Sequence, residues 1–354
     1  MLIFTSMNRD EVYMLRCLDL ASKGLQDVSP NPMVGAVLVY NDRVIGEGYH
    51  MQFGQPHAEV NCLNSVKDAD LEFICKSTLY VSLEPCNHHG KTPPCTDLII
   101  KNKIPRVFIG CKDPFEKVNG TGIQKLIDAG IAVETGILES NAIKLNKRFF
   151  TFHQHNRPYI ILKWVQSKDG YIASSNDKQT KISNAITDKL VHQWRSEESG
   201  IMVGTQTVIA DNPKLTVRHV VGKNPIRIFI DRKLQVNLQS EILDSSAPTI
   251  IFNQIFEKND GSNHYVKLSN ENYNLTRILK SLHSFGIMSV LVEGGSKLLQ
   301  SFIDNKIWDE ARVITNNELQ LLSGVASPFL NDASHGEVIT IQNDSLAFYY
   351  KKEQ

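Results

Sequence analysis

Apolar residues recur along the first half of the chain in short runs that predict strands, with helical segments between them. Strands are predicted over residues 34–40, 44–49, 78–84, 107–111 and 131–135. Helices are predicted over 9–23, 58–66, 96–102, 123–129 and 141–152. Asn8 is a suitable cap for the first helix, and Asn41-Asp42 forms a turn between the first two strands. This alternation indicates an α/β domain with one central sheet.

The second half repeats the alternation. Strands are predicted over 159–165, 201–204, 226–231, 249–252, 265–268, 289–293 and 310–315, and helices over 187–198, 275–285 and 296–304. The chain ends in a hairpin about Asn343-Asp344. A polar stretch from His153 to Pro158 ends in a helix breaker and predicts a linker between domains 1–152 and 157–354. His153 and His155 have no Cys or carboxylate partner there, so solvated side chains are favoured over metal ligands.

Charge and composition exclude several classes of protein. The chain has 354 residues, 38 of them basic and 38 acidic, with no polybasic run, which argues against a nucleic-acid binder. The apolar Leu2-Ile3-Phe4 is too short for a signal peptide. No apolar stretch approaches the roughly 20 residues that span a bilayer. Four cysteines, Cys17, Cys62, Cys75 and Cys111, are expected to be buried thiols of a cytoplasmic protein.

The most specific pattern is His57-Ala58-Glu59, followed by Pro85-Cys86 and Cys95. One His and two Cys supply three zinc ligands and leave the fourth position open for water, as catalytic zinc requires. Glu59 is then placed to transfer protons, the arrangement that zinc deaminases use on nucleobases. His57 and Cys95 each fall at a predicted helix start, where the helix dipole favours thiolate.

Two alternatives stay open at this site. Eight residues separate Cys86 from Cys95, and they include His88 and His89 as competing ligands. A closed structural zinc site also fits the ligand types, although such a site has no need of Glu59.

Three features of the second half indicate a nucleotide site. Residues 290–296 predict a strand, a Gly294-Gly295 turn and a helix, where backbone N–H groups can meet a phosphate, although such a turn is often only a turn. Residues 204–218 form a long polar connection of the kind that carries binding groups. Lys163 precedes Ser167-Lys168-Asp169-Gly170. The ordinary G-x-G-x-x-G dinucleotide fingerprint is absent from the sequence.

Taken together, these motifs resemble the bifunctional deaminase/reductase family of riboflavin biosynthesis over roughly residues 8–350. The resemblance is carried by the motifs N-P-M-V-G at 31–35, H-A-E at 57–59, P-C-N-H-H-G-K-T-P-P-C at 85–95, V-N-G-T-G at 118–122, and the family patterns L-K-x-x-x-S-x-D-G, G-x-x-T-V-x-x-D-x-P-x-L-T-V-R and V-E-G-G-x-x-L. It implies an α/β chain with an N-terminal, cytidine-deaminase-like three-layer domain and a C-terminal domain like dihydrofolate reductase.

The resemblance also implies the chemistry. One Zn²⁺ per chain, held by His57, Cys86 and Cys95, would deaminate 2,5-diamino-6-ribosylamino-4(3H)-pyrimidinone 5′-phosphate with Glu59 as the proton carrier. NADPH would then reduce the ribosyl group to ribityl. The family's cofactor contacts fall on Thr207, Asp211 and Gly295, and its substrate contacts fall on Arg195, Leu215, Arg218 and Glu293. We expect a small-molecule substrate, no nucleic-acid or membrane partner, a homo-oligomer and a cytoplasmic location.

The chain departs from the family pattern in three places. Phe115-Glu116 stands where a second Asn-Pro is more usual, Lys181 where Trp is usual beside the cofactor, and Lys168 where an apolar residue is usual.

Several other interpretations are open from the sequence. Arg195 is also consistent with a surface charge, and Arg218 with an ion pair to Asp211 or Asp231. Two rival functions are a deaminase of nucleosides or tRNA with an unrelated C-terminal domain, and a non-catalytic protein on a degenerate reductase scaffold. The groups that select NADPH over NADH are not evident from the sequence.

Overall fold

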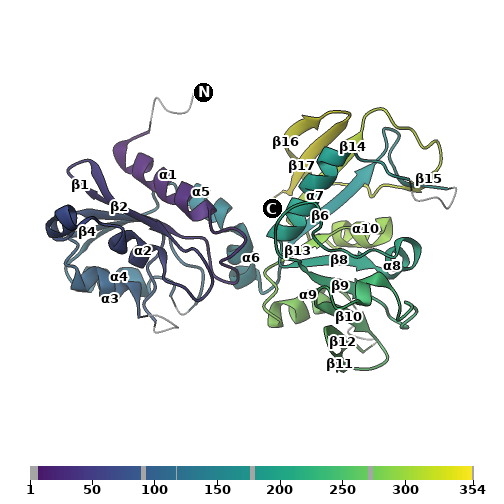
Figure 1. The fold of residues 1–354 in the computed structure, drawn as a ribbon, viewed down its shortest axis with the longest axis horizontal. Helices are drawn as coiled ribbons and strands as arrows, with labels where there is room; N and C mark the ends of the chain where they lie inside the picture. Colours follow the sequence, from purple (N-terminus) through teal and green to yellow (C-terminus); the bar gives the residue numbers. More distant parts are fainter. Residues whose placement is uncertain (1–6, 89–92, 117, 176–179, 270–273, 353–354) are drawn as a thin grey trace. The chain divides into compact units, whose positions relative to one another are not determined.

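The computed structural model describes residues 7–88, 93–116, 118–175, 180–269 and 274–352. The chain divides into two compact units, Met1–Asn156 and Arg157–Gln354 (Figure 1). Within the described residues, none of the helices combines the length and the apolar character needed to cross a membrane.

The N-terminal unit is a five-stranded sheet in the order β2-β1-β3-β4-β5, with helices on both faces (Figure 1). β3 to β5 are parallel neighbours, and β1 pairs antiparallel with β2 and β3. Its elements are α1 (Arg9–Ser22), β1 (Gly35–Tyr40), β2 (Arg43–Tyr49), α2 (Ala58–Asn64), a 3-10 helix (Asp68–Lys76), β3 (Thr78–Leu83), α3 (Cys95–Lys101), β4 (Arg106–Cys111), α4 (Thr121–Asp128), β5 (Ala132–Thr135), α5 (Glu139–Leu145) and α6 (Lys147–His155).

Alternation along the strands creates the three layers. Ala36 and Leu38 pack with α2, α3 and α4, whereas Val37 and Val39 point to the other face, against α1. α1 begins at a capping box in which the Asn8 side chain accepts from the Glu11 N–H and the Glu11 carboxylate accepts from the Asn8 N–H. The predicted three-layer domain is confirmed.

The end of this unit differs from the prediction of one helix over 141–152. Two helices, α5 and α6, meet at Asn146, whose side-chain amide donates to the Met33 carbonyl and accepts the Met33 N–H, both at 2.8 Å. α6 then runs through His153 and His155, so the predicted linker is shortened to residues 156–158, where the two units divide. The His153 ring packs on Phe115, Phe149 and Phe152, a contact that no pattern in the sequence indicates.

The cysteine expectation was also partly wrong. Cys17, Cys62 and Cys111 are buried, but Cys75 is exposed near the end of the 3-10 helix.

The C-terminal unit is built on a ten-stranded sheet in the order β11-β12-β10-β9-β8-β13-β6-β14-β17-β16. The strands from β12 to β14 in this order are parallel neighbours. Its elements are β6 (Tyr159–Gln166), β7 (Tyr171–Ser174), α7 (Ala185–Glu197), β8 (Gly200–Gly204), α8 (Thr205–Asp211), β9 (Ile226–Ile230), a 3-10 turn (Glu241–Leu243), β10 (Thr249–Asn253), β11 (Lys258–Asp260), β12 (Asn263–Lys267), α9 (Leu275–Ser284), β13 (Ser289–Val292), α10 (Ser296–Asp304), β14 (Glu310–Asn316), β15 (Gly324–Ala326), β16 (Ala333–Ile341) and β17 (Asp344–Lys351).

Helices cover both faces of this sheet. α9 and α10 pack on one face through Leu279, Leu299 and Phe302, and α7 packs on the other through Val191 and Trp194. The strands predicted here all form, and short β7, β11 and β15 were not predicted because runs of three or four residues carry little pattern. The sequence predicted a polar connection over 204–218, but its first half forms helix α8, which is anchored by buried Val208.

Candidate active sites

The three predicted zinc ligands meet at one edge of the N-terminal sheet. His57 is the N-cap of α2, Cys86 follows β3 by three residues, and Cys95 is the first residue of α3. The His57 Nδ1 lies 3.6 Å from the Cys86 sulfur and 3.4 Å from the Cys95 sulfur. All three ligand atoms fall within 4.8 Å of one another. Residues 38 positions apart in the chain therefore converge on one point.

These separations fit a tetrahedral zinc ion. With Zn–N near 2.0 Å and Zn–S near 2.3 Å, tetrahedral angles place nitrogen about 3.6 Å from each sulfur. The observed 3.4 and 3.6 Å agree with that spacing, and the donor set of one imidazole and two thiols is one that zinc prefers. Among the described residues no fourth His, Cys or carboxylate joins the cluster. Three protein ligands leave a position for water, as the catalytic interpretation requires.

His88, the competing histidine that the structure describes, does not join the cluster of His57, Cys86 and Cys95. His88 is exposed, and its ring lies edge-on to Phe115 at 6.1 Å between ring centroids. His89 lies outside the described residues. Phe115, which departs from the family pattern, thus sits between His88 and His153, at 5.0 Å from the latter ring.

The two thiols divide one proton between them. A hydrogen bond from Cys95, opposed by burial and supported by His57, lowers the pKa of Cys86 to about 4. The partner thiol, Cys95, has its pKa raised well above the ordinary value because it donates to Cys86 and is buried. Proximity to a second thiol and to His57 thus favours one thiolate in the pair, and the Cys86 sulfur also accepts the Cys95 backbone N–H at 3.4 Å. A thiolate is the form that binds metal.

Glu59 lies in the first turn of α2 and is 3% exposed. Burial, and then the negative charge of Cys86, raise the pKa of its carboxyl above the ordinary value. A raised pKa suits a group that must both accept and return a proton near neutral pH. Glu59 is close enough to the ligands to interact with the Cys95 thiol.

Two further polar residues beside the ligands were not predicted as site residues. His50 is 2% exposed and its ring meets the His57 ring edge-on at 5.3 Å between centroids. Its Nδ1 lies 3.1 Å from the Pro56 carbonyl and its Nε2 lies 3.0 Å from the Asn31 amide nitrogen. These partners make Nδ1 the donor and Nε2 the acceptor of a neutral ring. Asn31 belongs to the N-P-M-V-G motif, which was the available signal.

Glu84 is the second missed residue and organises the adjoining loop. Its buried carboxylate accepts backbone N–H groups from Asp113, Gly120, Gly122 and Ile123 at 2.9–3.3 Å. This clamps the start of α4 against the segment that leads into Cys86.

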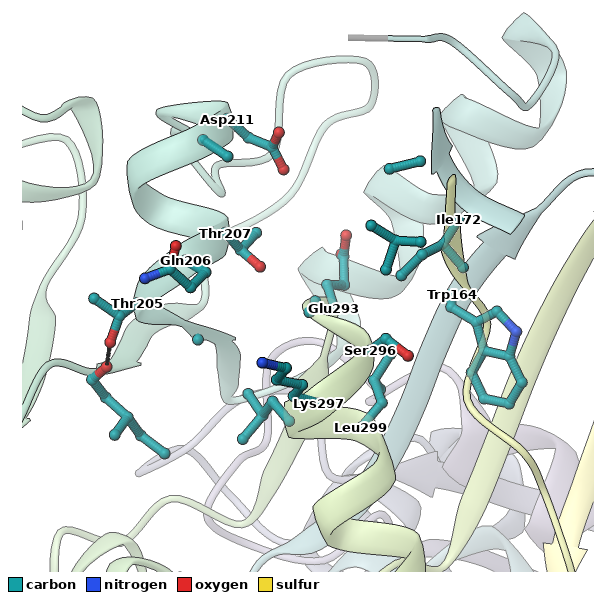
Figure 2. A pocket seen from close by; sticks show the side chains of 18 of the residues that line it. Trp164, Ile172, Thr205, Gln206, Thr207, Asp211, Glu293, Ser296, Lys297 and Leu299 are labelled. Atoms are coloured by element: carbon teal, nitrogen blue, oxygen red, sulfur yellow. Dashed lines mark hydrogen bonds between the residues drawn. The ribbon is translucent and has the colours of Figure 1, made fainter. Parts of the chain in front are cut away.

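In the C-terminal unit, a cavity of about 1300 Å³ lies where the parallel strands β6, β8, β9 and β13 end. Of the predicted residues, Thr207, Asp211, Glu293 and Gly295 line it (Figure 2). Gly294 and Gly295 let α8 approach, since a Cβ added at either would lie 3.1–3.2 Å from the Thr207 side chain. Gly295 also has φ +70 at the start of α10, a conformation that favours glycine.

Glu293 is the centre of a buried ion cluster. Arg195 donates to it through Nε at 2.7 Å and Nη2 at 2.8 Å, and the Lys163 ammonium lies 3.4 Å away. Burial alone would raise the pKa of Glu293, but Arg195 and Lys163 outweigh it and bring the pKa to about 2. Burial lowers the pKa of Lys163. Arg195 lies within α7 with 12% of its side chain exposed, so its interpretation as a surface charge was wrong.

Leu215 and Arg218 lie beside Arg195 rather than among the residues found to line the cavity. Arg195 donates to the Thr216 carbonyl at 3.4 Å, and the Arg218 N–H donates to His192 Nδ1 at 3.1 Å. Leu215 is buried with φ +53, a conformation that is strained for a non-glycine residue.

The acidic partners considered for Arg218 do not hold it in the described structure. Its guanidinium is exposed and donates to the Thr216 hydroxyl at 3.3 Å. Asp231 instead accepts the N–H groups of Gln235 and Val236. Lys181, at the usual Trp position, lines the cavity and forms an ion pair with Asp188 at 2.8 Å.

Comparisons with known proteins identify both domains of the chain. Residues 158–317 match the RibD C-terminal domain, and residues 7–111 match the zinc-binding region of cytidine and deoxycytidylate deaminases. The riboflavin biosynthesis protein RibD of Aquifex aeolicus is 42% identical over 85% of each chain, and that of Bacillus amyloliquefaciens is 38% identical over 92% of this chain and 91% of the other. Because residues 158–317 match the RibD C-terminal domain, the rival interpretation with an unrelated C-terminal domain is wrong.

Solved structures give the same result for the fold. A diaminohydroxyphosphoribosylaminopyrimidine deaminase/5-amino-6-(5-phosphoribosylamino)uracil reductase of Thermotoga maritima superposes with a TM-score of 0.88 at 35% identity, covering 97% of this chain and 99% of the other. RibD of Acinetobacter baumannii gives 0.88 at 31% identity, covering 98% and 99%.

Changing the ligands and changing Glu59 should have opposite effects on metal content. Cys86→Ser and Cys95→Ser should lose zinc, because each removes one of three protein ligands. Glu59→Gln should keep about one zinc per chain and lose at least about a hundredfold in deamination rate, the usual size of an acid–base contribution. Elemental analysis and ammonia release test this. Loss of zinc from Glu59→Gln would make Glu59 a ligand.

The buried cluster about Glu293 should make stability depend on pH in a defined direction. A carboxyl whose folded pKa is about 2 stabilises the protein above its ordinary pKa near 4.5 and progressively less below it. The stability difference between the parent and Glu293→Gln should therefore be roughly 3 kcal/mol at pH 7 and should fall by about half or more at pH 3. Urea unfolding at both pH values measures it, and a difference independent of pH would contradict an ionised Glu293.

Proposed function

Because the chain belongs to the RibD family of riboflavin biosynthesis proteins, we propose that His57, Cys86, Cys95 and Glu59 perform its deaminase step and that the cavity about Glu293 performs its reductase step. The chain is a bifunctional enzyme that uses zinc for the first step and NADPH for the second. The observation that carries the residue assignment is the His57–Cys86–Cys95 cluster with a buried, non-ligating Glu59 beside it. We assign the deaminase domain to residues 1–152 and the reductase domain to 157–354.

In the deaminase step an amino group on the pyrimidine ring is exchanged for oxygen. Bound zinc supplies a water whose pKa is lowered toward neutrality. Glu59 accepts the proton of that water while the water oxygen bonds to the ring carbon. It then returns protons to the ring nitrogen and to the departing amino group, which leaves as ammonia. Burial suits Glu59 to this double role, because a raised pKa makes its protonated form accessible.

In the reductase step NADPH supplies a hydride to C1′ of the ribosyl group. The bond between C1′ and the ring oxygen breaks, and that oxygen must gain a proton. Lys163 is the proton donor in this proposal, because it lines the cavity as a buried ammonium with a lowered pKa next to Glu293. Arg195 keeps Glu293 ionised, which in turn holds Lys163 in place.

The cofactor has one orientation in this proposal. Gly295 and Ser296, which line the cavity where α10 begins, would hold its diphosphate through backbone N–H groups. Arg232 and Lys233, which follow β9 and line the same cavity, would bind the 2′-phosphate. An acidic side chain that binds a ribose 2′-hydroxyl would select NADH, but the acid at this strand end, Asp231, is buried and bonded to the backbone.

The substrate phosphate is assigned to Arg218. Its guanidinium is exposed, and the strained Leu215 loop and His192 fix its backbone beside Arg195. A homo-oligomeric assembly and a cytoplasmic location stay predictions from the sequence.

The two steps should be separable within one chain. Chelation of zinc should stop ammonia release and leave NADPH oxidation on deaminated substrate unchanged, because the zinc ligands all lie at or before residue 95. Conversely, Glu293→Ala and Asp211→Ala should impair reduction by tenfold or more and spare deamination. Circular dichroism must first show intact structure. A well-folded Glu293→Ala enzyme that deaminates at about a few per cent of the parent rate would contradict two independent sites.

Selection of NADPH should depend on the cations that follow β9. Arg232→Gln together with Lys233→Gln should raise KM for NADPH by about tenfold or more, the loss expected for charge-assisted hydrogen bonds to phosphate, and leave KM for NADH nearly unchanged. Steady-state rates with each cofactor measure this, and Lys258→Gln, an exposed lysine on β11, is the control. Equal losses with both cofactors would place the 2′-phosphate elsewhere.

A further inference from the structure

One segment of the C-terminal unit, residues 319–329, stands apart from the ten-stranded sheet and is here called the arm. Its strand β15 pairs antiparallel with β7 in a separate two-stranded sheet (Figure 1). Ile172 and Ala173 of β7 and Val325 of β15 line the cavity. Gly324 is required for the pairing, because a Cβ there would collide with the Ala173 carbonyl oxygen. The arm is therefore part of the cavity wall.

The arm lies at one end of the cavity. β7 follows β6, the strand that supplies Lys163 and Trp164 to the lining. Arg232 and Lys233 follow β9, which is three strand positions from β6 in the sheet, or about 14 Å. Figure 2 shows Ile172 near Trp164, across the cavity from Thr205 and Gln206. In the cofactor orientation proposed above, the arm borders the nicotinamide end.

Side chains outside the cavity hold the arm at both ends, and Asn316, which accepts the Leu319 N–H at 2.9 Å, and Ser175, whose hydroxyl lies 2.8 Å from that of Ser323, add to the contacts of Asp169 and Gln300. The Asp169 carboxylate accepts the Leu321 N–H at 3.1 Å and the Leu322 N–H at 2.8 Å, and the Ser167 hydroxyl donates to it at 2.6 Å. At the other end, the Gln300 side chain on α10 accepts the Phe329 N–H at 2.8 Å and donates to its carbonyl at 3.4 Å. Neither Asp169 nor Gln300 is among the residues found to line the cavity.

Burial contributes little to the arm between these two points. Leu322 is 81% exposed, Val325 48% and Phe329 74%. Apolar side chains this exposed gain little from the hydrophobic effect, so hydrogen bonds fix the position of the arm. A nicotinamide ring at this end of the cavity would cover part of Val325.

We propose that Asp169 is a positioning residue of the reductase, which acts through the arm to form the wall against the nicotinamide end of NADPH. This proposal gives a role to the Asp of the Ser167-Lys168-Asp169-Gly170 motif. Asp169 itself neither lines the cavity nor belongs to the ion cluster about Glu293. The inference rests on the proposed cofactor site and orientation.

The test compares two ligands of the full-length enzyme by calorimetry. NADPH reaches both ends of the cavity, whereas adenosine 2′,5′-bisphosphate has the adenosine end alone. Asp169→Asn should raise Kd for NADPH fivefold or more and change Kd for adenosine 2′,5′-bisphosphate less than twofold. kcat/KM for NADPH should fall with the Kd, and ammonia release should be unchanged. Asp332→Asn, an exposed Asp with only a surface ion pair to Lys306, is the matched control.

Each outcome decides between the proposals. Unchanged NADPH affinity in a folded Asp169→Asn enzyme overturns the role of Asp169, and so does equal weakening of both ligands, which would indicate general damage to the unit. If Asp169→Asn does not fold, Gln300→Ala releases the other end of the arm from the surface of α10 and must show the same split between ligands. If the parent enzyme binds neither ligand, the cofactor site itself is wrong.

Discussion

The direction in which the strands run is the constraint on which both sites depend. Strands that run the same way end at one edge of a sheet, as β2 and β3 do on either side of antiparallel β1, and the helices that follow them begin there with their free N–H groups directed at the same space. In the N-terminal unit this brings Cys86, after β3, to the starts of α2 and α3, which carry His57 and Cys95. In the C-terminal unit it brings Gly204, Arg232 and Glu293 together from the ends of β8, β9 and β13.

Two buried charges, Arg227 and Glu293, are each surrounded by partners, and the kind of partner distinguishes a structural charge from a functional one. Arg227 is fully buried and is satisfied by the Asp244 carboxylate and by backbone carbonyls of the loop between β9 and β10. Arg227 is not among the residues found to line the cavity about Glu293, and its bonds fix the loop. Glu293 is satisfied by two cations, one of which lines a cavity. Such a cluster can hold an ammonium ready to release a proton.

Two departures from the family pattern are accommodated by local contacts. Lys181 pairs with Asp188 at the cavity mouth, where the more usual Trp would offer an apolar surface. Phe115 joins an aromatic group with His88, Phe149 and His153 beside the zinc ligands. Phe115 replaces an amide with a ring, and His153 comes from the last turn of α6, a turn that the sequence had predicted as the start of the linker.

The sequence by itself determined the strands and helices with periodic apolar residues and the motifs with characteristic spacing. Strands and helices with clear alternation formed where predicted, and the His57, Glu59, Cys86 and Cys95 pattern named a reaction, since those residue types suit few other tasks. The sequence did not predict contacts between residues that are distant in the chain. Asn146 binds Met33 from 113 residues away, Asp169 binds Leu322 from 153 away, and Arg195 meets Glu293 across 98. Only the tertiary structure decided that Arg195 is buried, that α6 continues to His155 and that Asp169 holds an arm, because a hydrogen bond or ion pair between distant residues leaves no periodic trace in the sequence.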